Sequence, residues 1–402
     1  MKLGSERAAG LIYLAVGLGL AAAVSLGVAR FAYALLLPAM RADLDWSYAT
    51  AGAMNTVNAA GYLAGALMLP RWQARFDGRQ VVVAGGVGTC LLLLLHGLVR
   101  LDEALYALRF ASGVASAASF AGGGLLAASL AQRPGGAERS GLILGIYYGG
   151  TGLGIVACSL AVPWVMDSVP LGLMVPWQRA WVALALLAAL STGVMVWMTR
   201  EMRSPPVSAS QREPAPLAAL RFGMAGYLCF GLGYIGYMTF IITLLREQGL
   251  SAPVVTAFYV LLGLGVVASS WLWARLLQRH RGGRPMATLN GLLALATVLP
   301  VLSAHPVVVL ASGALFGSVF LSVVASTTAL VRHNCAKAAW PSGIAAFTVI
   351  FAAGQIVGPV MVGWVSDASG GGLRTGFLMS AAFLALGSAL ASRQRALAPA
   401  SA

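Results

Sequence analysis

Residues 9–37 read AGLIYLAVGLGLAAAVSLGVARFAYALLL, an apolar stretch whose only charged residue is Arg30. A helix needs about 20 apolar residues to cross a bilayer, so this stretch is long enough to span one. It follows a basic start, as a signal peptide does, but its apolar run is about twice as long as a signal core and no clear small-x-small cleavage site follows. We therefore interpret it as a retained membrane helix.

The composition of the whole chain agrees with this reading. Of its 402 residues, 59% are hydrophobic and 9% charged, and the mean hydropathy is +0.83. A soluble domain carries roughly 25% charged residues, so this chain has too few to cover soluble domains. No run shows the alternation of barrel strands. The sequence predicts an all-α integral membrane protein with twelve transmembrane helices, over 9–37, 47–69, 80–99, 104–131, 140–166, 177–199, 222–245, 252–275, 285–303, 306–331, 341–365 and 374–392.

Residues 200–221, REMRSPPVSASQREPAPLAALR, are rich in Pro, Ser and charge and read as a cytoplasmic linker. We expect it to separate two pseudo-symmetric six-helix bundles, 1–199 and 222–402. The halves echo one another, because PRWQARFDGRQ at 70–80 and ARLLQRHRGGRP at 274–285 are both basic and both end with Gly-Arg near the next helix. This pattern is typical of duplicated transporters, which bind substrate between the halves near mid-membrane.

The basic residues predict the orientation. If both termini are cytoplasmic, nineteen of the 26 Lys and Arg residues lie inside, five lie outside, and Arg30 and Arg109 lie in the membrane. The net charge of +14 then reflects topology, and we expect no nucleic-acid partner. We expect a multi-pass protein of a bacterial inner membrane, surrounded by the lipid bilayer and monomeric.

Other classes of function lack support. The four cysteines, Cys90, Cys158, Cys229 and Cys335, have no metal-ligand spacing, and the chain has no nucleotide loop or nucleophile–base pattern. We therefore expect no enzyme activity, no metal and no cofactor. No Asp or Glu lies within the twelve predicted helices, so proton coupling would have to use a carboxylate at the rim or the substrate itself.

Several motifs resemble the major facilitator superfamily. RFASGVASA at 109–117 resembles its motif of Arg, three residues and Gly, and the two Gly-Arg loops look like decayed copies of its 2–3 loop motif. The stretches 29–67, GLGYIGYMTF at 231–240 and FAAGQIVGPVMVGWVSD at 351–367 are similar to its YbfB/YjiJ-type branch. The resemblance implies the two-bundle transporter fold and a central cavity lined by helices 1, 4, 7 and 10.

Arg30 and Arg109 are the leading candidates for substrate contact. A charge at membrane depth costs at least ~2.5 kcal/mol, so such residues are functional candidates by default. A guanidinium matches a carboxylate with two parallel hydrogen bonds. Alternatively, either arginine caps backbone carbonyls or extends toward the membrane surface. The further candidates are Tyr234, Tyr237, Asn58 and Gln355. Tyrosine is also common at membrane interfaces, and buried Asn and Gln often join helices by hydrogen bonds, so each has a structural alternative.

The sequence thus favours a secondary active transporter that moves a small molecule, with an organic anion such as a carboxylate as the expected class. One alternative is an efflux transporter for amphipathic or cationic compounds, with both arginines structural. Another is a membrane receptor that binds a ligand without moving it.

Overall fold

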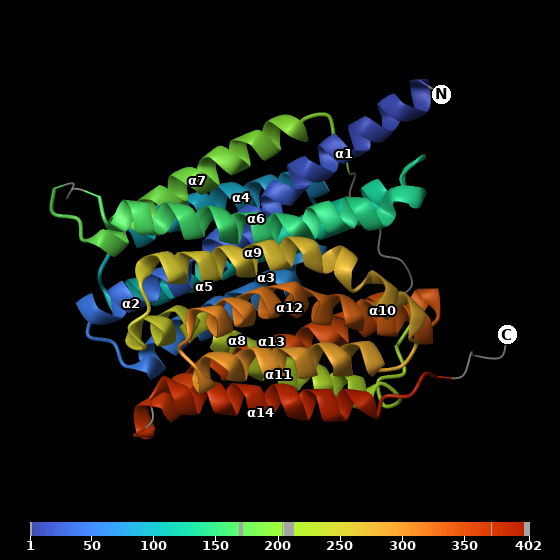
Figure 1. Cartoon of the computed structure of the whole chain (residues 1–402). Helices are drawn as coiled ribbons and strands as arrows, with labels where there is room; N and C mark the ends of the chain where they lie inside the picture. Colours follow the sequence, from blue (N-terminus) through green and yellow to red (C-terminus); the bar gives the residue numbers. More distant parts are fainter. Residues whose placement is uncertain (1, 169–171, 203, 205–212, 371, 398–402) are drawn as a thin grey trace. The chain divides into compact units, whose positions relative to one another are not determined.

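The computed structural model describes residues 2–168, 172–202, 204, 213–370 and 372–397 (Figure 1). Within these ranges the chain is helical and contains no strand. Eleven described helices are long and apolar enough to cross a membrane, and α3 (Tyr48–Gln73) lies between the first two of them in sequence. The predicted all-α, multi-spanning class is confirmed.

The contacts divide the chain into two units. Unit 1 comprises residues 1–45 and 57–208, and unit 2 comprises 46–56 and 209–402. The helix α3 therefore contributes its first turns to unit 2 and its remainder to unit 1. The linker predicted over 200–221 falls partly outside the described residues, and the predicted domain bounds remain a proposal.

Unit 1 is built from the helices that precede the linker (Figure 1). In chain order they are α1 (Lys2–Ala22), the π-helix η1 (Ala23–Phe31), α2 (Tyr33–Asp43), α3 from residue 57, α4 (Gly78–His96), α5 (Asp102–Ala131), the 3-10 turn η2 (Ala137–Arg139), α6 (Ser140–Met166) and α7 (Pro176–Met198). The helix α1 packs against α6 and α7, and α4 packs against α5 and α7.

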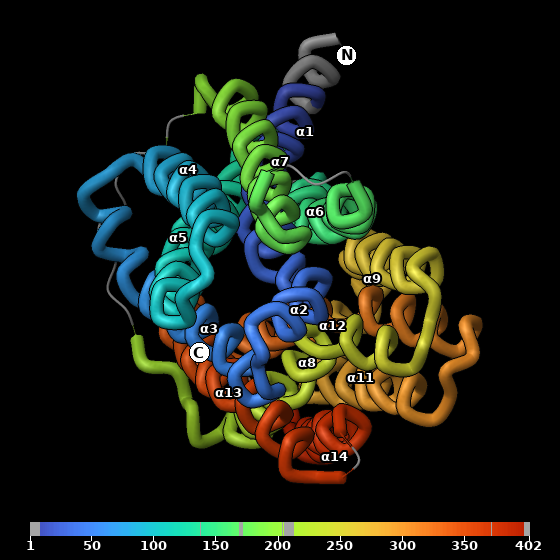
Figure 2. The backbone as a smooth tube through the Cα atoms, turned by 90° about the vertical axis from the view of Figure 1, so that its left-hand side faces the viewer, coloured from blue at the N-terminus to red at the C-terminus, as the bar shows by residue number. Residues whose placement is uncertain are grey.

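Unit 2 is a bundle of long helices packed side by side (Figure 2). Its helices are the first turns of α3, then α8 (Arg221–Glu247), α9 (Ala252–Leu272), α10 (Ala274–Arg279), α11 (Arg284–Leu302), α12 (Pro306–Asn334), the 3-10 turn η3 (Lys337–Ala339), α13 (Trp340–Ala368) and α14 (Leu373–Ser392). The helix α8 is the most enclosed, and it packs against α13 and α14.

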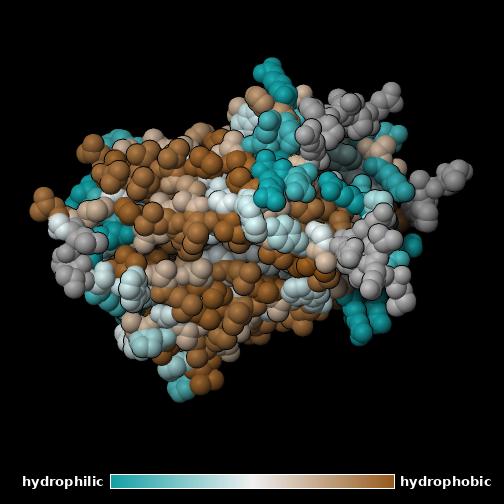
Figure 3. Space-filling view, turned by 90° about the horizontal axis from the view of Figure 1, so that it is seen from above, coloured by the Kyte–Doolittle hydropathy of each residue, from teal (hydrophilic) through white to brown (hydrophobic). Residues whose placement is uncertain are grey.

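The polarity of the surface fits a bilayer. Hydrophobic side chains cover the middle of the face that α6 and α7 present, and hydrophilic side chains gather toward the ends (Figure 3). Exposed Leu160, Trp164, Leu186 and Leu190 belong to these two helices. Lipid tails replace water along such a face, so the helices satisfy their own backbone groups there.

The first membrane crossing differs from its predicted form. A single helix over 9–37 is expected, but the crossing is divided into α1, η1 and α2, and α2 continues through Pro38 to Asp43. Arg30 consequently lies about 20 Å from the end of α2, deeper than the ~12 Å expected from an end at Pro38.

Candidate functional site

The π-helix η1 sets the position of Arg30. All nine of its residues are buried, and Arg30 lies in its last turn. A π-helix is rare and is often found at functional sites. Ser25 lies near its start and donates its hydroxyl hydrogen to the carbonyl of Ala21 at 2.6 Å. The backbone hydrogen-bond pattern changes from α to π at this point. The hydroxyl of Ser25 supplies a donor to the Ala21 carbonyl there.

Neighbouring helices supply further donors to the carbonyls of η1. The thiol of Cys158 on α6 donates to the carbonyl of Gly27 at 3.9 Å, and Nη1 of Arg109 on α5 donates to that of Ala29 at 3.2 Å. Gly27 also faces Gly154 so closely that a Cβ on Gly27 would lie 2.6 Å from the Cα of Gly154. The distorted segment is thus enclosed by α5 and α6 and stabilised by their side chains.

Arg109 is almost completely buried, with 1% of its surface exposed. Besides its bond to Ala29, its guanidinium lies over the ring of Tyr33, 4.6 Å from the ring centre. A cation over an aromatic face gains roughly 0.5–2 kcal/mol, more where water is excluded. Both contacts tie α5 to the first membrane crossing.

Arg30 is also buried, at 5% exposure, and its guanidinium lies 5.7 Å from the ring centre of Tyr62 on α3. Arg109 donates to the carbonyl of Ala29, the residue directly before Arg30, so the two buried arginines are neighbours. Two like charges held this deep cost at least ~2.5 kcal/mol each, and their mutual repulsion adds to that cost. A negative charge bound beside them would offset both terms.

Asn58 joins this arrangement through the backbone. Its Nδ2 donates to the carbonyl of Arg109 at 2.9 Å and to the hydroxyl of Ser112 at 3.1 Å. Three of the six predicted site residues, Arg30, Arg109 and Asn58, therefore lie together in unit 1. Asn58 acts there on the helix that carries Arg109 rather than on the guanidinium itself.

The other three predicted residues lie in unit 2. The hydroxyl of Tyr234 on α8 donates to Oε1 of Gln355 on α13 at 2.6 Å, so these two are brought together. The ring of Tyr234 stacks against Phe230 at 4.6 Å and Phe351 at 5.5 Å. This pair therefore places hydrogen-bonding groups beside a set of stacked aromatic rings.

Tyr237 has a different environment from Tyr234. Its ring is fully buried and stacks on Phe316 at 3.9 Å, and its hydroxyl shares a hydrogen bond of 2.6 Å with Ser312. Ser312 in turn donates to the carbonyl of Ala296 at 2.7 Å. These contacts place Tyr237 in the packing between α8, α11 and α12, and its role in substrate binding remains a prediction.

Tyr33 and Tyr62 contact the two buried arginines, and sequence reasoning missed both. Helical spacing contained the signal, because Tyr33 lies three residues after Arg30 and Tyr62 four residues after Asn58. Residues at these spacings share a helix face. This spacing is only a weak signal, because Tyr33 packs on Arg109 of α5 and Tyr62 on Arg30 of η1, and both contacts depend on how the helices pack.

The acidic side chains near the helix ends have structural partners. Asp43 pairs with Arg100 at 2.9 Å and accepts from Nε1 of Trp177 at 2.8 Å. Asp367 accepts from the backbone N–H groups of Tyr48 and Ala49, both within unit 2. Among the residues that the structure describes, no group of three His, Cys, Asp or Glu side chains could hold a metal ion.

Comparison with known proteins adds to this geometry. A curated relative named "Putative tartrate transporter" from Agrobacterium vitis is 27% identical in an alignment of length 395, and the match covers 86% of this chain and 83% of the relative. Its name describes a transporter, not an enzyme.

Solved structures share the fold. A bacterial homologue of the human lysosomal transporter Spinster, inward-facing and unoccupied, matches with a TM-score of 0.70 and 15% identity, covering 97% of this chain and 99% of its own. The nucleoside transporter NupG matches with a TM-score of 0.68 and 15% identity, covering 95% and 98%.

The family described as "Uncharacterised MFS-type transporter YbfB" matches residues 22–392, nearly the whole chain. The family resemblance inferred from the sequence motifs is therefore confirmed. The family and the relative are transporters rather than enzymes, as expected. The chain is a multi-pass membrane transporter, and it belongs to this YbfB family of MFS-type transporters.

Proposed function

We propose that the protein is a secondary active transporter that moves a small organic anion by alternating access. The burial of Arg30 and Arg109 in neighbouring positions of unit 1 carries this proposal. A cationic substrate would be repelled by these two charges, whereas an anion would offset the cost of holding them in the membrane.

The substrate class follows from the donors. Guanidinium groups present paired N–H donors that match the two oxygens of a carboxylate. The rings of Tyr33 and Tyr62 beside them would pack against the apolar atoms of a small carboxylate. The name of the Agrobacterium vitis relative supports this class, because tartrate carries two carboxylates.

Arg30 is the residue we assign to the carboxylate, and Arg109 serves mainly to position it. Arg109 donates to the carbonyl directly before Arg30 and packs on Tyr33, so it defines the end of η1. Tyr234 and Gln355 are proposed as contacts from unit 2. The inward-facing state of the Spinster homologue supports alternating access as the mode of transport.

A ligand-stabilisation screen tests this function. Purified protein is heated in the presence of tartrate, related carboxylates, their uncharged amides and small organic cations, and the melting temperature is recorded. We expect carboxylates alone to raise it. Stabilisation by cations, with no effect of any carboxylate, would instead favour the efflux alternative.

Uptake into proteoliposomes distinguishes a transporter from a receptor. A carboxylate that stabilises the protein should accumulate in vesicles that contain it and not in empty vesicles. Binding without any flux would refute transport. We further propose that the protein acts as a monomer in a bacterial inner membrane, with both termini cytoplasmic.

A further inference from the structure

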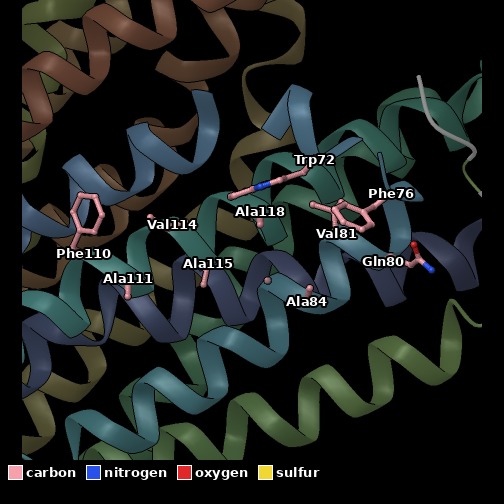
Figure 4. Close-up of a pocket in the computed structure, with 11 residues that line it drawn as sticks. Trp72, Phe76, Gln80, Val81, Ala84, Phe110, Ala111, Val114, Ala115 and Ala118 are labelled. Carbon is pink, nitrogen blue, oxygen red and sulfur yellow. The ribbon is translucent and has the colours of Figure 1, made fainter. Parts of the chain in front are cut away.

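A groove of about 850 Å³ lies on unit 1 between α3, α4 and α5, and its lining includes none of the residues of the proposed substrate site. Phe110 lies at one end and Phe76 and Gln80 at the other (Figure 4). The side chains between these ends are apolar, and they belong to Trp72, Val81, Ala84, Ala111, Val114, Ala115 and Ala118, with Gly85.

Small side chains line this groove. On α5, Ala111, Ala115 and Ala118 recur at helical spacing, so they line one face. The helix α4 approaches this face closely, since a Cβ on Gly85 would lie 2.7 Å from the carbonyl oxygen of Ala115. The two backbones form the floor, and the large rings of Trp72, Phe76 and Phe110 form the rims.

The surroundings of the groove indicate its occupant. Both α4 and α5 are membrane-crossing helices, and hydrocarbon chains are the solvent along such helices. Phe110 and Ala118 are separated by about 12 Å along α5 at ~1.5 Å per residue. One leaflet of a bilayer core is roughly 15 Å deep. The groove therefore has the length and polarity that one acyl chain requires.

Charge at one end adds specificity for the headgroup. Arg71 and Arg75 are exposed beside Trp72 and Phe76, where α3 ends. Asp77, the acidic residue of this connection, accepts from the backbone N–H groups of Arg79 and Ser204 at 2.8 Å each. Its charge is thus engaged by the backbone, and the exposed Arg71 and Arg75 add positive charge next to the groove residues Trp72 and Phe76.

We propose that the groove binds one anionic phospholipid, with an acyl chain along α5 and the phosphate at Arg71 and Arg75. Each basic residue near an anionic membrane surface strengthens binding roughly 5-fold, so the pair should contribute roughly 25-fold. The site is independent of the proposed substrate, because none of the candidate substrate residues lines it.

Native mass spectrometry of the full chain in detergent tests the proposal. The protein is titrated with phosphatidylglycerol and with phosphatidylcholine of identical chains, and we expect at least a 10-fold preference for phosphatidylglycerol. Arg71→Gln with Arg75→Gln should reduce phosphatidylglycerol binding to the level of phosphatidylcholine. The matched control is Arg275→Gln with Arg279→Gln, an exposed pair at the same spacing in unit 2, which should leave the preference unchanged.

A second set of variants tests the acyl chain. Ala84→Leu with Ala111→Leu fills the groove and should weaken binding of both lipids at least 10-fold, whereas Ala189→Leu at an exposed position of α7 should not. In wild type, phosphatidylglycerol with brominated chains should quench the fluorescence of Trp72, measured as the difference from Trp72→Phe. This second measurement needs no variant in the floor of the groove.

The following outcomes would overturn the proposal. Equal affinity of wild type for the two lipids would remove the headgroup site, and so would an unchanged preference in the Arg71 and Arg75 variant. Displacement of phosphatidylglycerol by millimolar inorganic phosphate would show that a free anion suffices and that the chain contributes nothing. Absence of quenching at Trp72 would place the chain elsewhere.

Discussion

Nη1 of Arg109 donates a hydrogen bond of 3.2 Å to the carbonyl of Ala29, the residue directly before Arg30. One buried arginine thus fixes the backbone from which the other projects. The two residues consequently have different expected roles, and substitutions can separate them.

Replacing Arg109 should primarily lower stability. Arg109→Gln removes the hydrogen bond to Ala29 and the cation over Tyr33, and a hydrogen bond from a charged group contributes about 1.5–3 kcal/mol. We expect a lower melting temperature, with a smaller loss of anion affinity than substitution of Arg30 causes. Thermal denaturation and ligand titration of the same preparation measure both quantities. An unchanged melting temperature would contradict the positioning role.

Replacing Arg30 should primarily lower affinity. Arg30→Gln removes the charge, and Arg30→Lys keeps the charge but loses the paired donors. Loss of one partner of a desolvated charge pair costs ~2–5 kcal/mol, which corresponds to at least a ~30-fold loss of affinity for a carboxylate. The measurement is ligand affinity by titration, alongside thermal stability.

A third buried arginine provides the control for Arg30. Arg179 is 6% exposed and donates to the carbonyl of Ser168 at 2.9 Å. Arg179→Gln should lower the melting temperature and leave affinity near that of wild type. Wild-type affinity in a folded Arg30→Gln protein would refute the anion site.

Asp367 should stabilise unit 2 through the start of α3. Its carboxylate accepts from the N–H groups of Tyr48 at 3.0 Å and Ala49 at 2.8 Å, both in the first turn of α3, where N–H groups are usually bonded by a capping side chain. Loss of a cap costs about 0.5–2 kcal/mol, so Asp367→Asn should lower the melting temperature. Asp167→Asn, at an exposed helix C-terminus, is the control and should have no effect. Equal melting of the two variants would exclude a capping role.

The sequence predicts helix positions well because bilayer crossing demands long apolar runs. The range 140–166 matches α6 at both ends, and the other ranges differ by a few residues. The exception is the first crossing. Its residues are almost all apolar, so no periodicity distinguishes the π-helix η1 from an α-helix. Pro38 suggests a helix end, but α2 continues past it.

The candidate site is predictable only in part. Arg30 and Arg109 stand out because charge is costly in apolar stretches, and this cost can be read directly from the sequence. The contact of Arg109 with Ala29 cannot be read in this way, because it depends on how α5 packs against η1. The same limit applies to Tyr234 and Gln355, which are 121 residues apart in sequence and joined by one hydrogen bond.

Cys335 provides a test of topology that also depends on pH. It lies between α12 and η3, outside the membrane-crossing segments, and burial raises the pKa of its thiol above the ordinary value near 8.5. The thiolate is the reactive form, so a membrane-impermeant maleimide should react slowly at pH 7 and faster as pH rises past 8.5.

If the termini are cytoplasmic, the loop that contains Cys335 is cytoplasmic too, and labelling should occur in inverted vesicles and not in right-side-out vesicles. Peptide mapping identifies the labelled residue, and Cys335→Ser is the control. Labelling confined to right-side-out vesicles would reverse the proposed orientation, and a rate that no longer rises above pH 7.5 would contradict the raised pKa.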